Sequence, residues 1–402
     1  MFCIIFGRGG EMEKVYEFHQ EEYGENPASV AEAPGRFHLI GEHSWFFKDK
    51  TLSMAVNFPV RVAVSLRDDG NLRFYYPQLK EKKRSTLSTM KYRKEDRWAN
   101  AIKCVVYGFN SAGFACQGMN FTVDSEILPS AGFGITTAIK VAAAWAIKDM
   151  MGFKCTKAQL LQVIEKGNKF FLGQENYKAD IFTAVFSKEN NIVLTDHNDG
   201  TYELLPFNFK DKVILLTDAR VPRIVTWNEE CLQQPENGLL LGDLKLRKSN
   251  VFGGWVYEDN GSEINETLSV VSEELRRRLI CIMKEHKYVL EAQSSLSKKE
   301  FSGFARAVNK SHENMRDNYE ISCPEIDWLL KRVGELDPSI EDIRTPSNCG
   351  RITGKGFGRC IFTVLRKEDV ESYKQKLVEY ERIFGFKPEC YEVKPVAGVH
   401  IL

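Results

Sequence analysis

The chain has 402 residues, and its 55 lysines and arginines balance 55 aspartates and glutamates, so its formal net charge at pH 7 is zero. This balance disfavours a general nucleic-acid binder. No apolar run approaches the ~20 residues that span a bilayer, so no membrane partner is expected. The ten cysteines form no Cys-x-x-Cys pair, which is typical of reduced thiols in a cytoplasmic protein.

Taken in chain order, the hydrophobic pattern predicts a mixture of helices and strands. Met12 precedes the first expected helix, and we expect it to be the biological start. The basic stretch at 80–84 is expected to be a solvated loop. Helices are expected at 13–24, 97–113, 138–150, 156–172, much of 263–332, and 372–384. Strands are expected at 37–41, 60–66, 191–194, 213–217 and 399–402.

The order of these elements indicates an α+β fold, because strands and helices do not alternate strictly along the chain. A break near 205–210 divides the chain into an N-terminal domain, 13–207, and a C-terminal domain, 208–402. Two domains in a chain of 402 residues would each have about 200 residues, which is within the usual range of domain sizes.

A loop rich in small residues, Pro-Ser-Ala-Gly-Phe-Gly-Ile-Thr-Thr-Ala, occupies 129–138 and precedes a strong helix-forming run. Small residues let backbone amides approach a phosphate closely, and the start of a helix favours an anion. Thr136 and Thr137 carry hydroxyls that suit Mg²⁺ or a phosphate oxygen. The alternative is a helix that one threonine merely caps. The loop is not a Walker A motif, since no Gly-Lys-Ser/Thr follows.

Two further segments combine residues that suit a polar site. At 351–359 the sequence Arg-Ile-Thr-Gly-Lys-Gly-Phe-Gly-Arg predicts a tight glycine loop between short apolar runs. At 34–43, Arg36, Glu42 and His43 lie within eight residues and would suit a polar pocket. By pattern alone, a surface ion pair and a structural histidine are the favoured explanation.

Taken together and in order, these segments resemble one family. The stretch Ala-Pro-Gly-Arg-Phe-His-Leu-Ile-Gly-Glu-His at 33–43 resembles the galactokinase signature APGR-x-N-LIGEHTDY. The 129–138 loop stands where that family has its serine-rich phosphate loop, and 353–358 resembles its third motif, TG-x-GFGG. Arg-Trp-Ala-Asn at 97–100 and the long segment 311–327 also match in order. The chain is thus identified as a member of the galactokinase branch of the GHMP kinases.

The resemblance implies a two-lobed fold with the active site between the lobes, and transfer of a phosphoryl group from ATP to the C1 hydroxyl of galactose. It implies a sugar and ATP as small-molecule partners, Mg²⁺ as the metal, and a monomer or weak oligomer. The segment 171–182 aligns without gaps to the family's FVG…GIMDQF, which places Asp180 on the catalytic aspartate. Arg36 falls on the catalytic arginine. The other implied residues are Glu42, His43, Trp45 and Asp180 for the sugar, Gly132, Gly134, Thr136, Thr137 and Trp98 for the nucleotide, and Thr137 and Asn168 for the metal.

Several positions depart from the family pattern. Trp45 replaces the aspartate that bonds sugar hydroxyls, and loss of such a partner can change selectivity by orders of magnitude. Asn168 replaces the glutamate that helps to hold Mg²⁺, and a neutral amide is a weaker partner for that ion. Phe133 and Ile135 alter the phosphate loop. The remaining departures are Lys178, two residues before Asp180, and Arg359, which replaces a glycine.

Three interpretations therefore stay open. In the first, the protein is an active kinase for galactose or a related sugar. In the second, it is a kinase whose acceptor differs because Trp45 reshapes the pocket. In the third, it is a degenerate homologue that binds a sugar or nucleotide without efficient catalysis, as the changes at Phe133, Ile135 and Asn168 would favour.

Overall fold

The computed structural model describes residues 11–44, 47–127, 133–174, 177–222, 269, 271–337, 345–354 and 359–402. Its α-helices are α1 (Glu11–Tyr23), α2 (Ala99–Ser111), α3 (Ile135–Met150), α4 (Lys157–Gly167), α5 (Lys178–Phe186), α8 (Glu273–Ser297), α9 (Phe301–Asn314), α10 (Pro324–Gly334) and α11 (Val370–Phe384). Its strands are β1 (Ser29–Ile40), β2 (Lys50–Arg67), β3 (Asn71–Tyr76), β4 (Glu81–Thr86), β5 (Gly118–Ser125), β6 (Asn191–Asp196), β7 (Thr201–Pro206), β8 (Lys212–Asp218), β9 (Cys349–Ile352), β10 (Cys360–Arg366), β11 (Glu389–Val393) and β12 (His400–Ile401).

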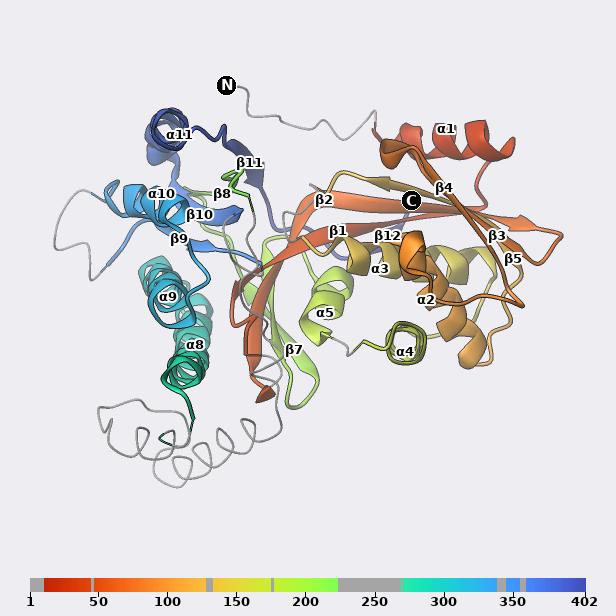
Figure 1. The fold of residues 1–402 in the computed structure, drawn as a ribbon, viewed down its shortest axis with the longest axis horizontal. Coiled ribbons are helices and arrows are strands. Elements are labelled where there is room, and N and C mark those ends of the chain that lie inside the picture. The colour runs from red at the N-terminus through yellow and green to blue at the C-terminus, as the bar shows by residue number, and fades with distance from the viewer. Residues whose placement is uncertain are drawn as a thin grey trace.

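In the described part of the chain, eight strands form a first sheet in the order β12-β1-β2-β5-β3-β4, with β6 pairing with β2 and β7 with β6. The long strands β1 and β2 are buried along almost their whole length, because helices cover both faces of their sheet. Figure 1 shows α1 above this sheet and α2, α3, α4 and α5 below it. The layer of small and branched residues on α3 packs into the main apolar core with β1 and β2.

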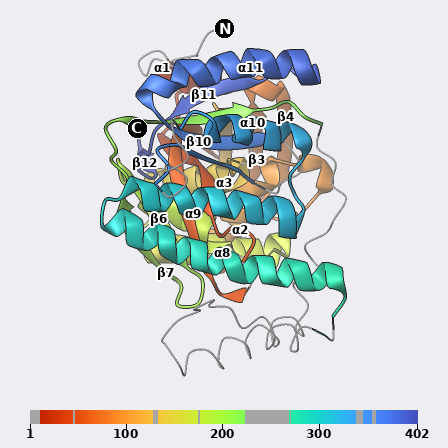
Figure 2. The same ribbon diagram turned by 90° about the vertical axis from the view of Figure 1, so that its left-hand side faces the viewer.

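The second described sheet has the order β11-β8-β10-β9 and is antiparallel throughout. Helices α8 to α11 belong to the same half of the chain, and Figure 2 shows the long pair α8 and α9 running side by side below α10. A second apolar cluster fills the space between this sheet and α8, α10 and α11. The α+β fold expected from the order of elements is therefore confirmed.

The end of the chain returns to the first sheet. The short strand β12 pairs with β1, and the amide of Leu402 donates to the Val30 carbonyl at 2.9 Å. The amide of Val396 likewise donates to the Ala55 carbonyl on β2. The last residues therefore connect the second sheet to the first by backbone hydrogen bonds.

Several expected elements are confirmed and one is wrong. The predicted helices have counterparts within a few residues where the structure describes them, and α1 agrees with the helix expected at 13–24. The strands expected at 37–41 and 60–66 are the last parts of the longer β1 and β2, which begin at Ser29 and Lys50. The stretch 80–84 is not a loop: most of it belongs to β4, which pairs with β3 at the edge of the first sheet. Along β4, half-buried and exposed side chains alternate, and the exposed ones include Lys82 and Arg84. The run of basic residues therefore suggested a solvated loop where the chain forms a strand. The segment 218–265 is polar and reads from the sequence as irregular, and most of it lies outside the described residues.

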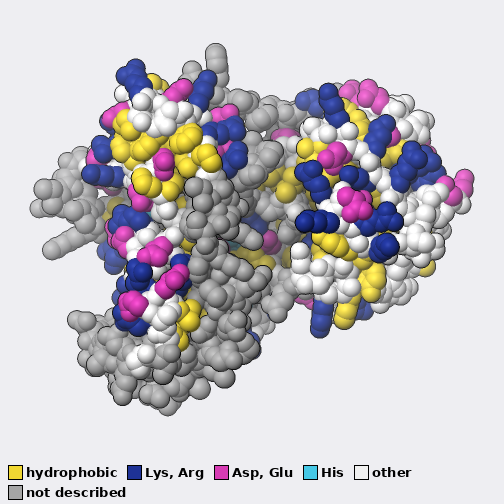
Figure 3. Space-filling model, in the orientation of Figure 1, with side chains coloured by type: hydrophobic (Ala, Val, Ile, Leu, Met, Phe, Trp, Pro, Cys, Tyr) yellow, Lys and Arg dark blue, Asp and Glu magenta, His cyan; other side chains and the backbone are white. Residues whose placement is uncertain are grey.

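Charged side chains of both signs are interspersed on the face drawn in Figure 3, in keeping with the zero net charge. Among the described helices, none is both long and apolar enough to cross a membrane. The eight cysteines within the described residues form no disulfide with one another.

Candidate active site

Asp180 lies in the first turn of α5, and its carboxylate accepts hydrogen bonds from three side chains. Arg36 Nη2 donates to Asp180 Oδ2 at 2.5 Å, and the Thr137 hydroxyl donates to the same oxygen at 3.3 Å. His38 Nε2 lies 3.0 Å from Asp180 Oδ1. Both carboxylate oxygens are therefore held, by residues that come from β1 and from the start of α3.

The backbone brings these elements together. The Arg36 amide donates to the Phe133 carbonyl at 2.9 Å, which fixes β1 against the residue just before α3. Gly134 then takes a left-handed conformation, with φ at +67°. A Cβ at Gly134 would lie 2.8 Å from Arg36 Cζ, so glycine leaves the space that the guanidinium fills.

The surroundings of Asp180 keep its carboxyl ionised. Burial alone would raise the pKa of Asp180, but the Arg36 guanidinium and the hydrogen bond from His38 outweigh it and hold the pKa well below the ordinary range. Burial and the same guanidinium lower the pKa of His38, so its ring is neutral at pH 7. Because an ionised carboxylate only accepts, Nε2 of His38 carries the hydrogen, and Nδ1 accepts from the Ser53 hydroxyl at 2.7 Å.

A layer of buried polar side chains lies behind His38. The Tyr177 ring meets the His38 ring edge-on and stacks on His197, with centroids 5.1 Å and 5.2 Å apart. The Thr51 hydroxyl links them, 3.2 Å from the Tyr177 hydroxyl and 3.1 Å from His197 Nε2. Burial lowers the pKa of His197 to about 4, so this layer adds no positive charge at neutral pH.

Glu42 belongs to a second buried network, which joins it to Arg351 on β9. Arg351 Nη1 donates to Glu42 Oε1 at 2.6 Å, and Arg351 Nε donates to the Ser311 hydroxyl at 2.6 Å. Burial would raise the pKa of Glu42, but Arg351 lowers it, so Glu42 is ionised. Its other oxygen, Oε2, is buried and makes no hydrogen bond with any described residue. That oxygen can accept from a ligand hydroxyl.

The structure places most of the other predicted site residues, but not all of them at one point. His43 Nε2 lies 3.9 Å from Glu42 Oε1, and the His43 ring packs on Tyr319. Thr136 is exposed in the first turn of α3, beside Thr137. Trp45 and Gly132 lie outside the described residues.

Trp98 lies at a different edge of the first sheet. Its indole Nε1 donates to Glu81 Oε2 at 2.8 Å, and its ring packs edge-on against Tyr76 and Phe74. No contact among the described residues joins Trp98 to Asp180. Its predicted place near an adenine base stays a prediction.

Asn168 does not fit the predicted role of metal ligand. Lys140 Nζ donates to Asn168 Oδ1 at 2.6 Å, and the Cys104 thiol donates to the same oxygen at 3.4 Å. A divalent ion would have to displace an ammonium from that oxygen. Within the described ranges, no group of three His, Cys, Asp or Glu side chains is placed to hold a metal ion. Thr137 keeps acceptor lone pairs, since its single hydrogen points to Asp180.

Two of the departures noted in the sequence have partners away from Asp180. The Lys178 ammonium lies against Gly200, where an added Cβ would come within 2.6 Å of Nζ. The hydrogen bonds to Asp180 come instead from Arg36, His38 and Thr137. Arg359 Nε donates to Asp218 Oδ2 at 3.2 Å.

Sequence reasoning missed three residues of these networks: His38, Lys140 and Arg351. His38 stands at the asparagine position of the signature, so a polar side chain there was a usable signal. Arg351 opens the glycine segment at 351–359, and a fully buried arginine needs carboxylate partners that only the fold supplies. Lys140, in the apolar run of α3, is a charged residue on a buried face.

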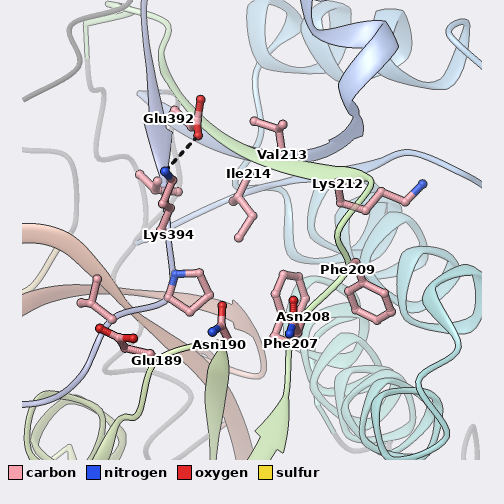
Figure 4. Close-up of a pocket in the computed structure, with 13 residues that line it drawn as sticks. Glu189, Asn190, Phe207, Asn208, Phe209, Lys212, Val213, Ile214, Glu392 and Lys394 are labelled. Atoms are coloured by element: carbon pink, nitrogen blue, oxygen red, sulfur yellow. Dashed lines mark ion pairs between the residues drawn. The ribbon is translucent and has the colours of Figure 1, made fainter.

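A pocket of about 380 Å³ lies elsewhere, between the end of β7 and the strands β8 and β11. Figure 4 shows Phe207, Phe209 and Asn208 on one side, and Glu392 and Lys394 on another. The residues of the Asp180 and Glu42 networks do not line it.

Comparison with known proteins identifies the fold class. The fold matches the crystal structure of Lactococcus lactis galactokinase complexed with galactose, with a TM-score of 0.81 and 20% identity, over 97% of this chain and 100% of that one. It also matches Methanococcus jannaschii mevalonate kinase, with a TM-score of 0.60 and 13% identity, over 91% and 98% of the two chains. The family model "GHMP kinases N terminal domain" matches residues 100–188. The fold is thus that of the GHMP kinases.

Closer relatives narrow this class. The family model "Galactokinase galactose-binding signature" matches residues 17–66. A protein named "Putative galactokinase" from Treponema pallidum is 39% identical over 398 residues, 97% of each chain. The galactokinase of Thermotoga maritima is 27% identical over 91% of this chain and 98% of its own length. The chain belongs to the galactokinase family and is a galactokinase-like sugar kinase that uses ATP. These similarities do not favour the degenerate binding protein.

Proposed function

We propose that this kinase transfers the terminal phosphoryl group of ATP to the C1 hydroxyl of galactose or a closely related sugar, at Asp180. The observation that carries this proposal is the partly buried, ionised Asp180 carboxylate held by Arg36 and His38 beside the start of α3. An ionised carboxylate can accept the proton of a sugar hydroxyl as the phosphoryl group arrives. Arg36 keeps Asp180 ionised and neutralises negative charge that develops beside it.

We assign the sugar to the side of Asp180 that faces Glu42. The Oε2 atom of Glu42 supports this assignment, since it is a buried acceptor without a partner among the described residues. His43 and Trp45 follow Glu42 closely in the chain and are assigned to the same ligand. An indole can stack on the apolar face of a sugar, where an aspartate would bond a hydroxyl.

The phosphates are assigned to the start of α3, where Gly134, Thr136 and Thr137 leave the helix dipole and backbone amides open to an anion. Gly132 and Trp98 are assigned to the nucleotide on the family resemblance alone. Mg²⁺, when bound, neutralises phosphate charge, and in this proposal it enters with the nucleotide beside Thr137.

We also propose that 13–207 and 208–402 are the two lobes, with the site between them. The Glu42 to Arg351 pair and the hydrogen bond from Thr353 Oγ1 to the His38 carbonyl support this division, because each joins the two segments beside the candidate site. A monomer or weak oligomer in the cytoplasm is our expectation for the assembly and its location.

The experiment is a turnover assay with MgATP over a panel of free hexoses, for the wild type and for Asp180→Asn. ADP release gives the rate, and phosphorus NMR of the product gives the position of the phosphate. We expect galactose to be phosphorylated at C1, and Asp180→Asn to lower kcat by about 10²–10⁴, the usual contribution of a general base. Asp317→Asn, at an exposed aspartate of the second segment, is the matched control.

Each outcome of this panel has a defined meaning. Phosphorylation of a different hexose alone would keep the kinase chemistry and make Trp45 the specificity residue to exchange. A folded wild type with no turnover on any hexose would contradict the proposal. Full activity in Asp180→Asn would show that the acceptor proton goes elsewhere.

A further inference from the structure

Lys140 is a buried cation that the proposed reaction leaves unused. It lies one turn after Thr137 on α3, so both side chains share one face of the helix. Its side chain is buried, although α3 is otherwise apolar on its packed face. Burying an ammonium is costly unless it is bonded to a partner.

The partner of Lys140 is the amide oxygen of Asn168, at 2.6 Å. Asn168 stands at the position where the family has a metal-binding glutamate. The exchange of glutamate for asparagine removes a negative charge, and Lys140 adds a positive charge at the same point. Asn168 and Lys140 together carry one positive charge. A glutamate at 168 with a neutral residue at 140 would carry one negative charge, so the local charge here is two units more positive.

Lys140 also lies close enough to Asp180 to interact with it: burial lowers the pKa of the Lys140 ammonium, and the Asp180 carboxylate opposes that shift. Arg36 already pairs with that carboxylate, and the neutral His38 adds no charge. The two cations that act on the Asp180 carboxylate are therefore Arg36 and Lys140. A divalent cation placed at Asn168 would meet repulsion from the ammonium instead of attraction from a carboxylate.

We propose that the Lys140 ammonium takes the place of a divalent metal ion beside Asn168, so that the protein itself does not bind a metal ion there. In this enzyme the Lys140 ammonium occupies the place beside Asn168 and Thr137 where a metal ion would need an acidic ligand. Among the described residues this place then offers Mg²⁺ no site of the protein's own, and the metal reaches it only as the complex of the nucleotide. This inference rests on the proposed phosphoryl transfer at Asp180.

The test measures binding of Mn²⁺ alone, a spectroscopic substitute for Mg²⁺, to the full chain without nucleotide. Electron paramagnetic resonance of free Mn²⁺ is followed for the wild type, Lys140→Met, Asn168→Glu and the double variant. We expect no binding to the wild type at millimolar Mn²⁺. In Asn168→Glu the new carboxylate pairs with Lys140, so we expect little gain. In the double variant the carboxylate is free, and we expect Mn²⁺ to bind about tenfold or more tightly than to either single variant.

Lys148→Met, in the last turn of the same helix, is the control for loss of a lysine from α3, and it is expected to gain no Mn²⁺ affinity. Circular dichroism and binding of MgATP show whether each variant is folded. If the double variant does not fold, Mn²⁺ binding is compared between Lys140→Gln and the wild type. Tighter binding by Lys140→Gln would support the inference, and equal binding would contradict it. Loss of turnover would count against the proposed function and would leave these binding results unaffected.

Two results would overturn the inference. Stoichiometric Mn²⁺ binding by the wild type that Asn168→Ala abolishes would make Asn168 a metal ligand in the presence of Lys140. A folded double variant that binds Mn²⁺ no better than the wild type would show that the place beside Asn168 is not that of the metal.

Discussion

At the scale of single residues, His38 most changes the expected chemistry of the site. The family signature has asparagine there, whereas here a neutral imidazole donates to Asp180 Oδ1 and accepts from Ser53. This arrangement fixes one tautomer and orients the carboxylate toward Arg36. His38 acts through Asp180, so it is a positioning residue.

Replacing His38 tests this role through the pH profile. His38→Leu removes a hydrogen bond to the charged form of Asp180, and such a loss raises the pKa of the carboxyl. An aspartate whose pKa rises is protonated at higher pH, so we expect the acid limb of kcat/KM to move to higher pH. We expect kcat to fall about tenfold, as for loss of a charged hydrogen bond. The measurement is the rate across pH for both proteins.

His38→Asn supplies the comparison that separates positioning from packing. The amide keeps an N–H donor and matches the family signature, so it is expected to recover most of the rate and the wild-type acid limb. An acid limb that stays in place in His38→Leu would contradict the role of His38. Wild-type activity itself is expected to show no loss from Asp180 protonation above about pH 4, the ordinary pKa of an aspartate.

At the scale of elements, the start of α3 determines the geometry of the site. The helix begins after a left-handed glycine, Gly134, and the space above that glycine holds the Arg36 guanidinium. The same helix ends in a second left-handed glycine, Gly152, with nothing within 4 Å of an added Cβ. Both glycines therefore need a positive φ, but only Gly134 has a side chain, that of Arg36, where its own Cβ would lie.

This pair gives a matched test by alanine substitution. Both Gly134→Ala and Gly152→Ala place a Cβ in the left-handed region, which costs about 1 kcal/mol. Only Gly134→Ala also displaces Arg36, so we expect kcat to fall about a hundredfold in that variant and to stay unchanged in Gly152→Ala. Denaturant unfolding compares the stabilities, and steady-state kinetics compares the rates. Equal rates in the two variants would show that Arg36 tolerates displacement.

Elements also show which features of the molecule the sequence could predict. Helical periodicity located α2 and α3 well, because their apolar faces repeat with the helical spacing. The residues of β1 include Pro34 and Gly35, which disfavour a strand locally, and the pairing with β2 overrides them through a register shift at that point. The edge strand β4 was hidden by its basic residues.

The predictable part of the site was the part carried by motifs. Arg36 and Asp180 could be located because each lies in a segment that resembles the family, and the structure brings them into contact. Asn168 was predicted from its position alone, and its ammonium partner Lys140 lies 28 residues away in sequence. Such a pairing depends on how α3 packs beside the residue that follows α4, which periodicity does not specify.

At the scale of the whole molecule, the Arg351 network joins the two segments of the chain. Arg351 on β9 bonds Glu42, which follows β1, and lies 3.4 Å from Glu285 on α8. All three side chains are buried. Burial raises the pKa of Glu285 above its usual value even with Arg351 present, so the two carboxylates depend on one guanidinium.

Removing that guanidinium should destabilise the protein in a pH-dependent way. Arg351→Met leaves buried carboxylates unpaired, which costs about 3–5 kcal/mol at neutral pH. Without Arg351 the folded-state pKa values of Glu42 and Glu285 lie above those of the unfolded chain, so the folded state binds more protons. Stability then falls as pH rises through those values, and the loss relative to wild type should be smaller at about pH 5 than at about pH 8.

Urea unfolding of both proteins at the two pH values measures this difference. Arg316→Met removes an arginine from an exposed pair with Asp317 and is the control, expected to change stability by less than about 1 kcal/mol at either pH. A loss in Arg351→Met that is the same at both pH values would mean that Glu42 and Glu285 stay ionised without their partner. In that case water must reach the buried contact between the two segments, and the Arg351 ion pairs would not be what stabilises that contact.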